Sequence, residues 1–147
     1  MPELHSSNAE LTVRPFRLTD RAELESLWST VFPDDPPWNA PALMIERKLG
    51  VQPELLLVAT LGAELVGAVI AGFDGVRGWI YHLAVLPLWR RRGIATALVR
   101  NAESGLATLG CTKVNLQVRA TNAEVVSFYK SLGYLLEERV SMGRRLA

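Results

Sequence analysis

The chain has 147 residues, of which 49% are hydrophobic and 21% charged, enough for one buried core and too few residues for two ordinary domains. Sixteen Lys and Arg against fifteen Asp and Glu leave a net charge of +1, which argues against a general nucleic-acid-binding protein. One cysteine excludes an internal disulfide, and with two histidines it does not form a structural zinc site by itself. We expect no signal peptide or membrane span, a cytoplasmic location, a flexible tail over residues 1–10 and a single domain over residues 11–147.

The first third of the chain predicts one strand and two helices. Asp20 and Glu23 fit a capping box at the start of the first helix, because apolar residues then recur at helical spacing. Asn39 is expected to cap the second helix, whose Glu46–Lys48 run is typical of a solvated helix face. The predicted elements are a strand over residues 11–16, a helix over residues 20–31 and a helix over residues 39–49.

The middle of the chain predicts three consecutive strands. Two apolar runs joined by Gly62-Ala63 indicate a β-hairpin, and a third run follows the turn at residues 74–78. The strands are expected over residues 55–61, 65–73 and 79–85.

The last third predicts a helix over residues 92–109, a strand over 114–118 and a helix that Asn122 caps and that ends near residue 132. Residues 134–147 are expected to form one or two closing strands. An antiparallel meander followed by a β-α-β crossover implies an α/β fold with a mixed, mostly antiparallel sheet and helices on both faces.

A basic loop joins the third middle strand to the next helix. Arg90, Arg91 and Arg92 precede Gly93 and Ala95, and the free N–H groups of a helix N-terminus favour an anion there. In the other interpretation, Gly93 relieves crowding between strand and helix, and the arginines are solvated. The chain has neither a Walker phosphate-binding motif nor a G-x-G-x-x-G motif, so an NTPase or a Rossmann dehydrogenase is not expected.

The segment LAVLPLWRRRGIA at residues 83–95 resembles the acyl-CoA pyrophosphate loop of the GNAT superfamily of N-acetyltransferases. Residues 115–134, NLQVRATNAEVVSFYKSLGY, resemble the later strand and helix of the same superfamily. Residues 38–48 and 73–78 look like small bacterial YpeA-type members, whereas residues 116–122 are closer to the RimI type, which acetylates protein N-termini. The resemblance covers the chain from residue 11 onward.

The resemblance implies a GNAT fold in which two parallel strands splay apart and hold acyl-CoA between them. The main chain of Leu83 and Val85 would bind pantetheine, and the N–H of Val85 would polarise the thioester carbonyl. Ala95 replaces the second glycine of the commonest loop, which matters only if its φ is positive. The implied cofactor-binding residues are Leu83, Ala84, Val85, Arg90, Arg91, Arg92, Gly93, Ile94, Ala95, Thr96, Asn122 and Tyr129.

The resemblance also assigns Tyr129 as the acid that protonates the leaving thiolate, since a phenol keeps its proton at neutral pH. The alternative is that Tyr129 is simply a core aromatic residue of its helix. The general base does not carry over, because Gln117 stands where RimI-type enzymes have a glutamate, and an amide cannot accept the ammonium proton.

Four other side chains are candidates for the missing base. Tyr81 with an ordered water is the preferred relay, and Glu46 and Asp74 are carboxylate candidates. Strand alternation places His82 on the face opposite to Tyr81 and Leu83, so His82 is expected to be a packed residue unless a bulge breaks the alternation.

The expected function is transfer of an acetyl group from acetyl-CoA to a primary amine, by direct attack in a ternary complex. The alternatives are an acyl-CoA-binding sensor or partner subunit, which Gln117 keeps open, and a transferase for another acyl group or acceptor. We expect acetyl-CoA and an amine acceptor as partners, no metal, no nucleic acid, no membrane, and a monomer or homodimer.

Overall fold

The computed structural model describes residues 10–147, so the tail expected at residues 1–10 lies outside the described part, Glu10 excepted. The chain divides into two compact units, the first ending at Leu116 and the second running from Gln117 to Ala147.

The first unit contains a five-stranded sheet in the order β1-β2-β3-β4-β5. The first four strands pair antiparallel with their neighbours and β5 pairs parallel with β4, which confirms the mixed sheet. The strands are β1 (Leu11–Pro15), β2 (Leu56–Leu61), β3 (Glu64–Phe73), β4 (Gly78–Val85) and β5 (Val114–Leu116). The helices of this unit are α2 (Arg21–Val31), α3 (Pro41–Leu49) and α4 (Ile94–Thr108).

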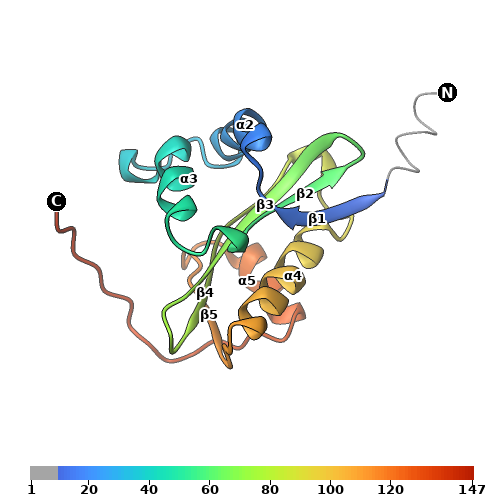
Figure 1. Cartoon of the computed structure of the whole chain (residues 1–147). Coiled ribbons are helices and arrows are strands. Elements are labelled where there is room, and N and C mark those ends of the chain that lie inside the picture. Colours follow the sequence, from blue (N-terminus) through green and yellow to red (C-terminus); the bar gives the residue numbers. More distant parts are fainter. Residues whose placement is uncertain (1–9) are drawn as a thin grey trace. The chain divides into compact units, whose positions relative to one another are not determined.

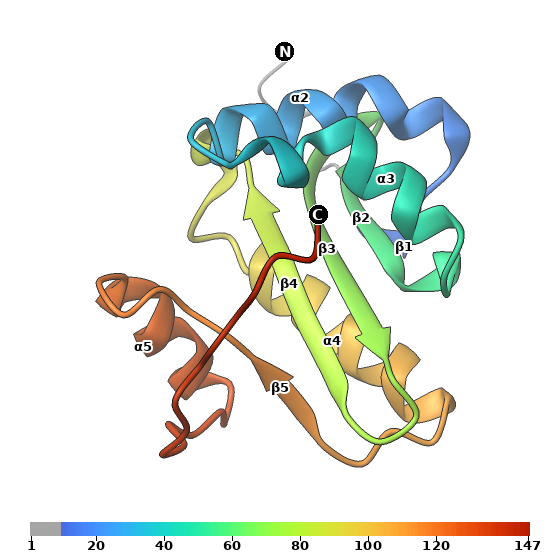
Figure 2. The ribbon, with the colours of Figure 1, turned by 90° about the vertical axis from the view of Figure 1, so that its left-hand side faces the viewer.

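Helices cover both faces of this sheet (Figures 1 and 2). Helices α2 and α3 lie on one face and α4 on the other. Apolar side chains recur along α2 and α4 because one side of each helix packs on the sheet. The core under α2 and α3 contains Leu24, Leu27, Trp28, Ile45, Leu56, Val58, Leu65, Ala68, Ile70 and Ala84, and α4 buries Ile94, Leu98, Ala102 and Leu106.

The side-chain caps predicted for the starts of α2 and α3 are wrong. Asp20 makes no side-chain cap to α2; its carboxylate accepts from Arg17 N–H (2.8 Å) and pairs with Arg14 (2.7 and 2.9 Å). Glu23 instead accepts from the N–H of Leu65 (3.1 Å). Asn39 is the last residue of a 3-10 turn, and the N-cap of α3 is the next residue, Ala40.

The second unit contains α5 (Ala123–Ser131), and Asn122 caps it as expected, accepting from Val125 N–H at 3.3 Å. The closing strands predicted after it are wrong, because residues 134–147 pair with no strand of the described chain. Within this segment Arg139 N–H donates to the C=O of Glu137, which is a local turn. The large apolar side chains of the segment other than Tyr134 are exposed, so they form no buried strand face: Leu135, Leu136, Val140, Met142 and Leu146.

Candidate active site

Strand β4 contains a β-bulge. Tyr81 lies opposite Ile70 and Ala84 lies opposite Ala68, so three steps along β4 match two steps along β3. The extra residue gives His82 a φ of +54°, a backbone conformation that is rare for a side-chain-bearing residue. The simple alternation expected from the sequence is therefore wrong beyond His82, and Tyr81 shares a face with Ala84.

His82 is a packed side chain, as expected. Its ring lies 5.3 Å from that of Trp28 and 4.9 Å from that of Phe32, and its Nε2 is 3.1 Å from Oδ2 of Asp35. Burial lowers the pKa of His82, and the neighbouring Asp35 opposes that shift only in part. The ring is therefore neutral near physiological pH and is held by α2 and the loop that follows it.

The end of β4 has an open edge. Strand β5 pairs only with Gly78–Ile80, and no strand among the described residues pairs with residues 81–85 on that side. The parallel pair therefore separates after three residues, and β4 continues for five more with β3 as its only neighbouring strand among the described residues. The separation of these two strands matches the splay expected of a GNAT fold.

The N–H of Val85 points to this open edge. Leu86 N–H donates to the C=O of Val66 (2.9 Å), so the adjacent pair, Gly67 and Val85, is a non-hydrogen-bonded pair of the antiparallel ladder. In such a pair the N–H and C=O groups point away from the partner strand. The C=O of Val85 accepts from Nε of Arg90 (3.2 Å), which leaves its N–H directed outward.

The N-terminus of α4 presents further backbone donors. Gly93 is the N-cap, with a φ of +78° and no side-chain cap, and Ala97 N–H bonds back to its C=O (3.0 Å). The N–H groups of Ile94, Ala95 and Thr96 therefore have no partner within the helix, and the helix dipole favours an anion beside them. Ala95 has an ordinary helical φ, so alanine fits there.

The three arginines before α4 differ in their contacts and exposure. Arg90 binds the end of β4, and the guanidinium of Arg92 lies 4.9 Å from the ring centre of Trp89. Arg91 is exposed and has a φ of +63°. Nothing lies within 4 Å of a Cβ placed on Gly93, so the space beside the free N–H groups is open. Arg90 and Arg92 thus shape the loop, and the loop meets the requirements of a phosphate site.

Sequence reasoning missed a glycine that brings α4 close to the sheet. Gly67 lies opposite Val85, and a Cβ on it would be 3.0 Å from Ala84 O, 3.0 Å from Leu98 Cδ1 and 3.2 Å from Ile94 Cγ2. Only a residue without a side chain allows this approach. It places the first turn of α4 against the end of β4, so the two sets of outward N–H groups are neighbours.

A pocket of about 550 Å³ lies on the other face, between α3 and strands β3 and β4. The sequence predicted that Tyr81 faces the reaction cleft; it lines this pocket together with Trp79, Phe73 and Met44. Two cationic residues of α3, Arg47 and Lys48, also line it. The expected solvated face at residues 46–48 is correct for Glu46 and Arg47 but wrong for Lys48, which is buried.

A glutamine closes the far end of β3. Gln52 has a φ of +53°; its Nε2 donates to the C=O of Phe73 (2.9 Å) and its Oε1 accepts from the N–H of Phe73 (2.9 Å). The side-chain amide thus takes the place of a neighbouring strand and holds this wall of the pocket. No sequence signal indicated this role.

The candidates for a general base are poorly suited to it. Glu46 accepts from Arg21 (3.3 Å) and does not line the pocket. Asp74 lines the pocket, but hydrogen bonds from the N–H groups of Arg77 and Val76 lower its pKa and make it a weaker base. Burial raises the pKa of Tyr81, so its hydroxyl stays protonated.

The remaining predicted residues belong to the second unit. The ring of Tyr129 contacts those of Phe128 (5.1 Å between centres) and Tyr134 (5.5 Å), and burial raises the pKa of Tyr129 to about 12. The Nε2 of Gln117 donates to Oγ of Ser141 (2.7 Å). Tyr129 thus has the protonation state of an acid, and Gln117 serves as a hydrogen-bond donor.

Residues 20–134 match the sequence pattern of the family described as Acetyltransferase (GNAT) family. The chain belongs to this family. An acetyltransferase of Sodalis glossinidius is 43% identical over 139 residues, which span 92% of this chain and 96% of that protein. An acetyltransferase of Yersinia enterocolitica is 41% identical over 138 residues, with the same coverage. This chain is therefore an N-acetyltransferase.

Solved structures share the GNAT fold. The aminoglycoside N-acetyltransferase AAC(6')-Iy, in complex with a CoA-containing bisubstrate analogue, has a TM-score of 0.80 at 20% identity, covering 95% of this chain and 100% of that one. The PaiA N-acetyltransferase of Thermoplasma acidophilum, in complex with coenzyme A, has a TM-score of 0.76 at 18% identity, covering 89% and 93%. Among the described residues of this GNAT chain, no helix is long and apolar enough to cross a membrane.

Proposed function

We propose that this acetyltransferase moves the acetyl group of acetyl-CoA to a primary amine in a ternary complex. The observation that carries the proposal is the pairing of two sets of outward N–H groups, that of Val85 at the open edge of β4 and those of Ile94, Ala95 and Thr96 at the start of α4. The first suits a thioester carbonyl and pantetheine, and the second suits a pyrophosphate.

In this proposal the backbone from Arg91 to Thr96 binds the pyrophosphate, with Arg90 holding the loop to β4. The edge formed by Leu83, Ala84 and Val85 binds pantetheine, to which Asn122 adds a contact. The N–H of Val85 donates to the carbonyl oxygen as negative charge develops there, a contribution that enzymes commonly use in acyl transfer.

The acceptor amine enters from the pocket lined by Trp79 and Tyr81. The free amine attacks the thioester carbon, and the proton that its nitrogen then loses passes to a water held by Tyr81. The carbon–sulfur bond then breaks, Tyr129 gives its proton to the departing thiolate, and solvent returns a proton to Tyr129. Because the thioester is already activated, most of the catalysis comes from positioning and from the N–H of Val85. We further propose that this GNAT enzyme works in the cytoplasm.

The test compares two glycines at opposite ends of α4. Gly93→Glu places a negative charge beside the free N–H groups, whereas Gly110→Glu adds the same side chain at the other end of the helix. Both positions have positive φ, +78° and +92°, and open space around a Cβ, so both variants carry similar backbone strain.

Acetyl-CoA at about 100 times its Kd stabilises the wild type by about 2.7 kcal/mol, which raises Tm by roughly 5 to 10 °C. We expect Gly110→Glu to keep this shift and Gly93→Glu to lose it. Release of CoA, with mass detection of the acetylated amine, measures the reaction itself. A full shift in Gly93→Glu overturns the binding site, and acetyl-CoA binding without CoA release to any amine supports a sensor instead.

A further inference from the structure

The pocket between α3 and the sheet contains a buried lysine. Lys48, in the last turn of α3, is only 6% exposed, and its Nζ lies 3.7 Å from the position of a Cβ on Gly72 of β3. Burial lowers its pKa, and the more distant charge of Glu54 opposes this shift. A buried ammonium is costly unless something compensates its charge.

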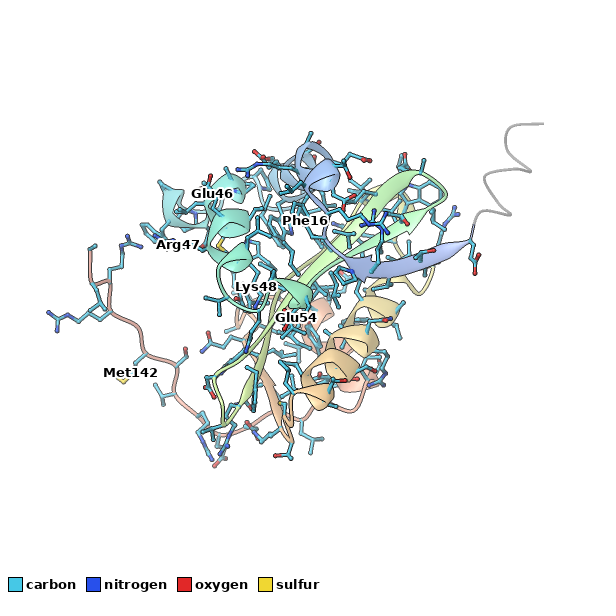
Figure 3. The ribbon with its side chains drawn as sticks, viewed as in Figure 1. Phe16, Glu46, Arg47, Lys48, Glu54 and Met142 are labelled. Carbon is cyan, nitrogen blue, oxygen red and sulfur yellow. The ribbon has the colours of Figure 1, made fainter. Side chains whose placement is uncertain are left out.

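This ammonium has no fixed partner in the described part of the chain. No carboxylate among residues 10–147 lies within 4.0 Å of the Nζ of Lys48, and none of their other acceptors lies within hydrogen-bond distance of it. Every fully enclosed side-chain nitrogen or oxygen of these residues does have a partner, so the Nζ must open to solvent. The space into which it opens is the pocket that Lys48 lines. Figure 3 labels Lys48 in the last turn of α3.

The other charges of the pocket do not neutralise Lys48. Arg47, the preceding residue of α3, adds a second cationic side chain to the lining. Asp74 is the one lining carboxylate, but its Oδ1 already accepts from the N–H groups of Val76 and Arg77, both at 2.7 Å. The pocket therefore offers two cationic groups against one carboxylate that is occupied by its own turn.

We propose that this pocket selects acceptor amines that also carry an acidic group, which Lys48 and Arg47 bind while the amine is acetylated. The proposal rests on the proposed function and names its substrate class. A carboxylate or phosphate supplies the counter-charge that Lys48 lacks, and hydrogen bonds between charged groups are the strong ones. The aromatic and aliphatic walls, which include Met44 and Trp79, suit the carbon chain between the two groups.

The geometry also sets the spacing between amine and acid. Lys48 contacts the sheet at Gly72, and the N–H of Val85, which is proposed to bind the thioester carbonyl, lies opposite Gly67. Five residues of strand separate these points, roughly 16 Å at about 3.3 Å per residue, and a hydrogen bond of about 2.9 Å at each end leaves roughly 10 Å for the substrate. An α-amino acid acetylated at its α-amine is too short, because a single carbon joins its two groups. A longer ω-amino acid spans the distance.

The experiment compares 8-aminooctanoate with octylamine, which have the same primary amine and differ in the terminal carboxylate. We expect the wild type to show a kcat/KM for 8-aminooctanoate that is roughly ten- to hundredfold higher, the range typical of a hydrogen bond between charged groups. Lys48→Met keeps the length of the side chain and removes the charge, so it abolishes the preference for 8-aminooctanoate over octylamine. Lys48→Arg restores part of the preference.

Arg100→Gln is the charge-matched control, since Arg100 lies on α4, on the other face of the sheet, and pairs with Glu103. It should keep the full preference. Equal kcat/KM for the two amines in the wild type, or a preference for a polyamine such as spermidine, overturns the proposal.

Calorimetry on CoA-saturated protein separates this proposal from the proposed function. We expect 8-acetamidooctanoate to bind the wild type and not Lys48→Met, whether or not any amine is acetylated. Binding of this kind without turnover means that the pocket assignment stands and the proposed function fails. Absence of binding to the wild type overturns the pocket assignment.

Discussion

Tyr129 keeps its proton over the whole pH range in which an acetyltransferase is assayed, because burial raises its pKa to about 12. This is the state that an acid needs when a thiolate leaves, since a free thiol has a pKa near 8.5 and its thiolate takes a proton from a donor placed within reach.

The sequence could suggest Tyr129 from its motif. It could not suggest Lys48, because the Glu46–Lys48 run has the composition of a solvated face and burial depends on the sheet beneath it.

Tyr129→Phe should lower turnover by roughly ten- to thousandfold, the usual contribution of a general acid, and leave acetyl-CoA affinity nearly unchanged. The reason is that the ring still packs against Phe128 and Tyr134 while the proton is lost. Steady-state kinetics and acetyl-CoA titration measure the two effects.

Tyr134→Phe is the matched control, since it removes a hydroxyl from the neighbouring ring. It should leave turnover within a few-fold. Equal turnover of Tyr129→Phe and the wild type would sink the assignment of Tyr129.

At the scale of elements, an ion pair ties β1 to the start of α2. Arg14 binds both carboxylate oxygens of Asp20, which is 5% exposed, and this hydrogen-bonded pair lowers the pKa of Asp20. A lowered carboxyl pKa means that the folded chain favours the charged form. The stabilisation is therefore present above the unfolded pKa, near 3.9, and is lost as pH falls through the folded pKa.

Asp20→Asn should lower the free energy of unfolding by about 1.5–3 kcal/mol at neutral pH, the range for a hydrogen bond to a charged group. The loss should shrink as pH falls below about 4, because the carboxyl of the unfolded chain is then protonated, and it should vanish below the lowered pKa of the folded carboxyl. Urea denaturation at pH 7 and near pH 3 measures both values.

Glu25→Gln is the control for Asp20→Asn, because Glu25 pairs with Arg21 on the same helix but is 37% exposed. Exposed pairs of this kind contribute about 0.3–0.5 kcal/mol. A loss no larger than this in Asp20→Asn, or one independent of pH, would contradict the role of the pair.

The order of elements could be read from apolar periodicity and turn residues, and it is confirmed from β1 to α5. The bulge at His82 could not be predicted from the sequence, because the sequence of an apolar strand looks the same with or without one unpaired residue. The sequence does not reveal whether a neighbouring strand is there to pair with residues 134–147, so the closing strands expected there are wrong. The close approach at Gly67 is likewise a property of the packed helix, since nothing in the sequence marks this glycine as different from others.

Over the whole molecule, none of the candidate bases has properties that suit neutral pH. The pKa of Asp74 is lowered by its turn, that of Tyr81 is raised by burial, and His82 is packed against α2. The supply of free amine then depends on the solution equilibrium of the acceptor.

We therefore expect kcat/KM to rise about tenfold per pH unit until the pKa of the acceptor amine, near 10.4 for a simple alkylamine. Rates with one identified amine from about pH 6 to 9 test this. A plateau with its midpoint near neutrality would reveal a base. His82→Gln would then identify it if the plateau disappeared.

The bulge in β4 also decides which way the N–H of Val85 points. If β4 paired regularly from Tyr81 onward, Val85 would lie opposite Val66 in a hydrogen-bonded pair, and its N–H would face β3. The extra residue therefore keeps this donor at the open edge. A relative one residue shorter here needs no bulge, because two steps along each strand then bring Ala84 opposite Ala68 and Val85 opposite Gly67. A change of chain length by one residue at this point is therefore compatible with the oxyanion donor only when the bulge is gained or lost with it.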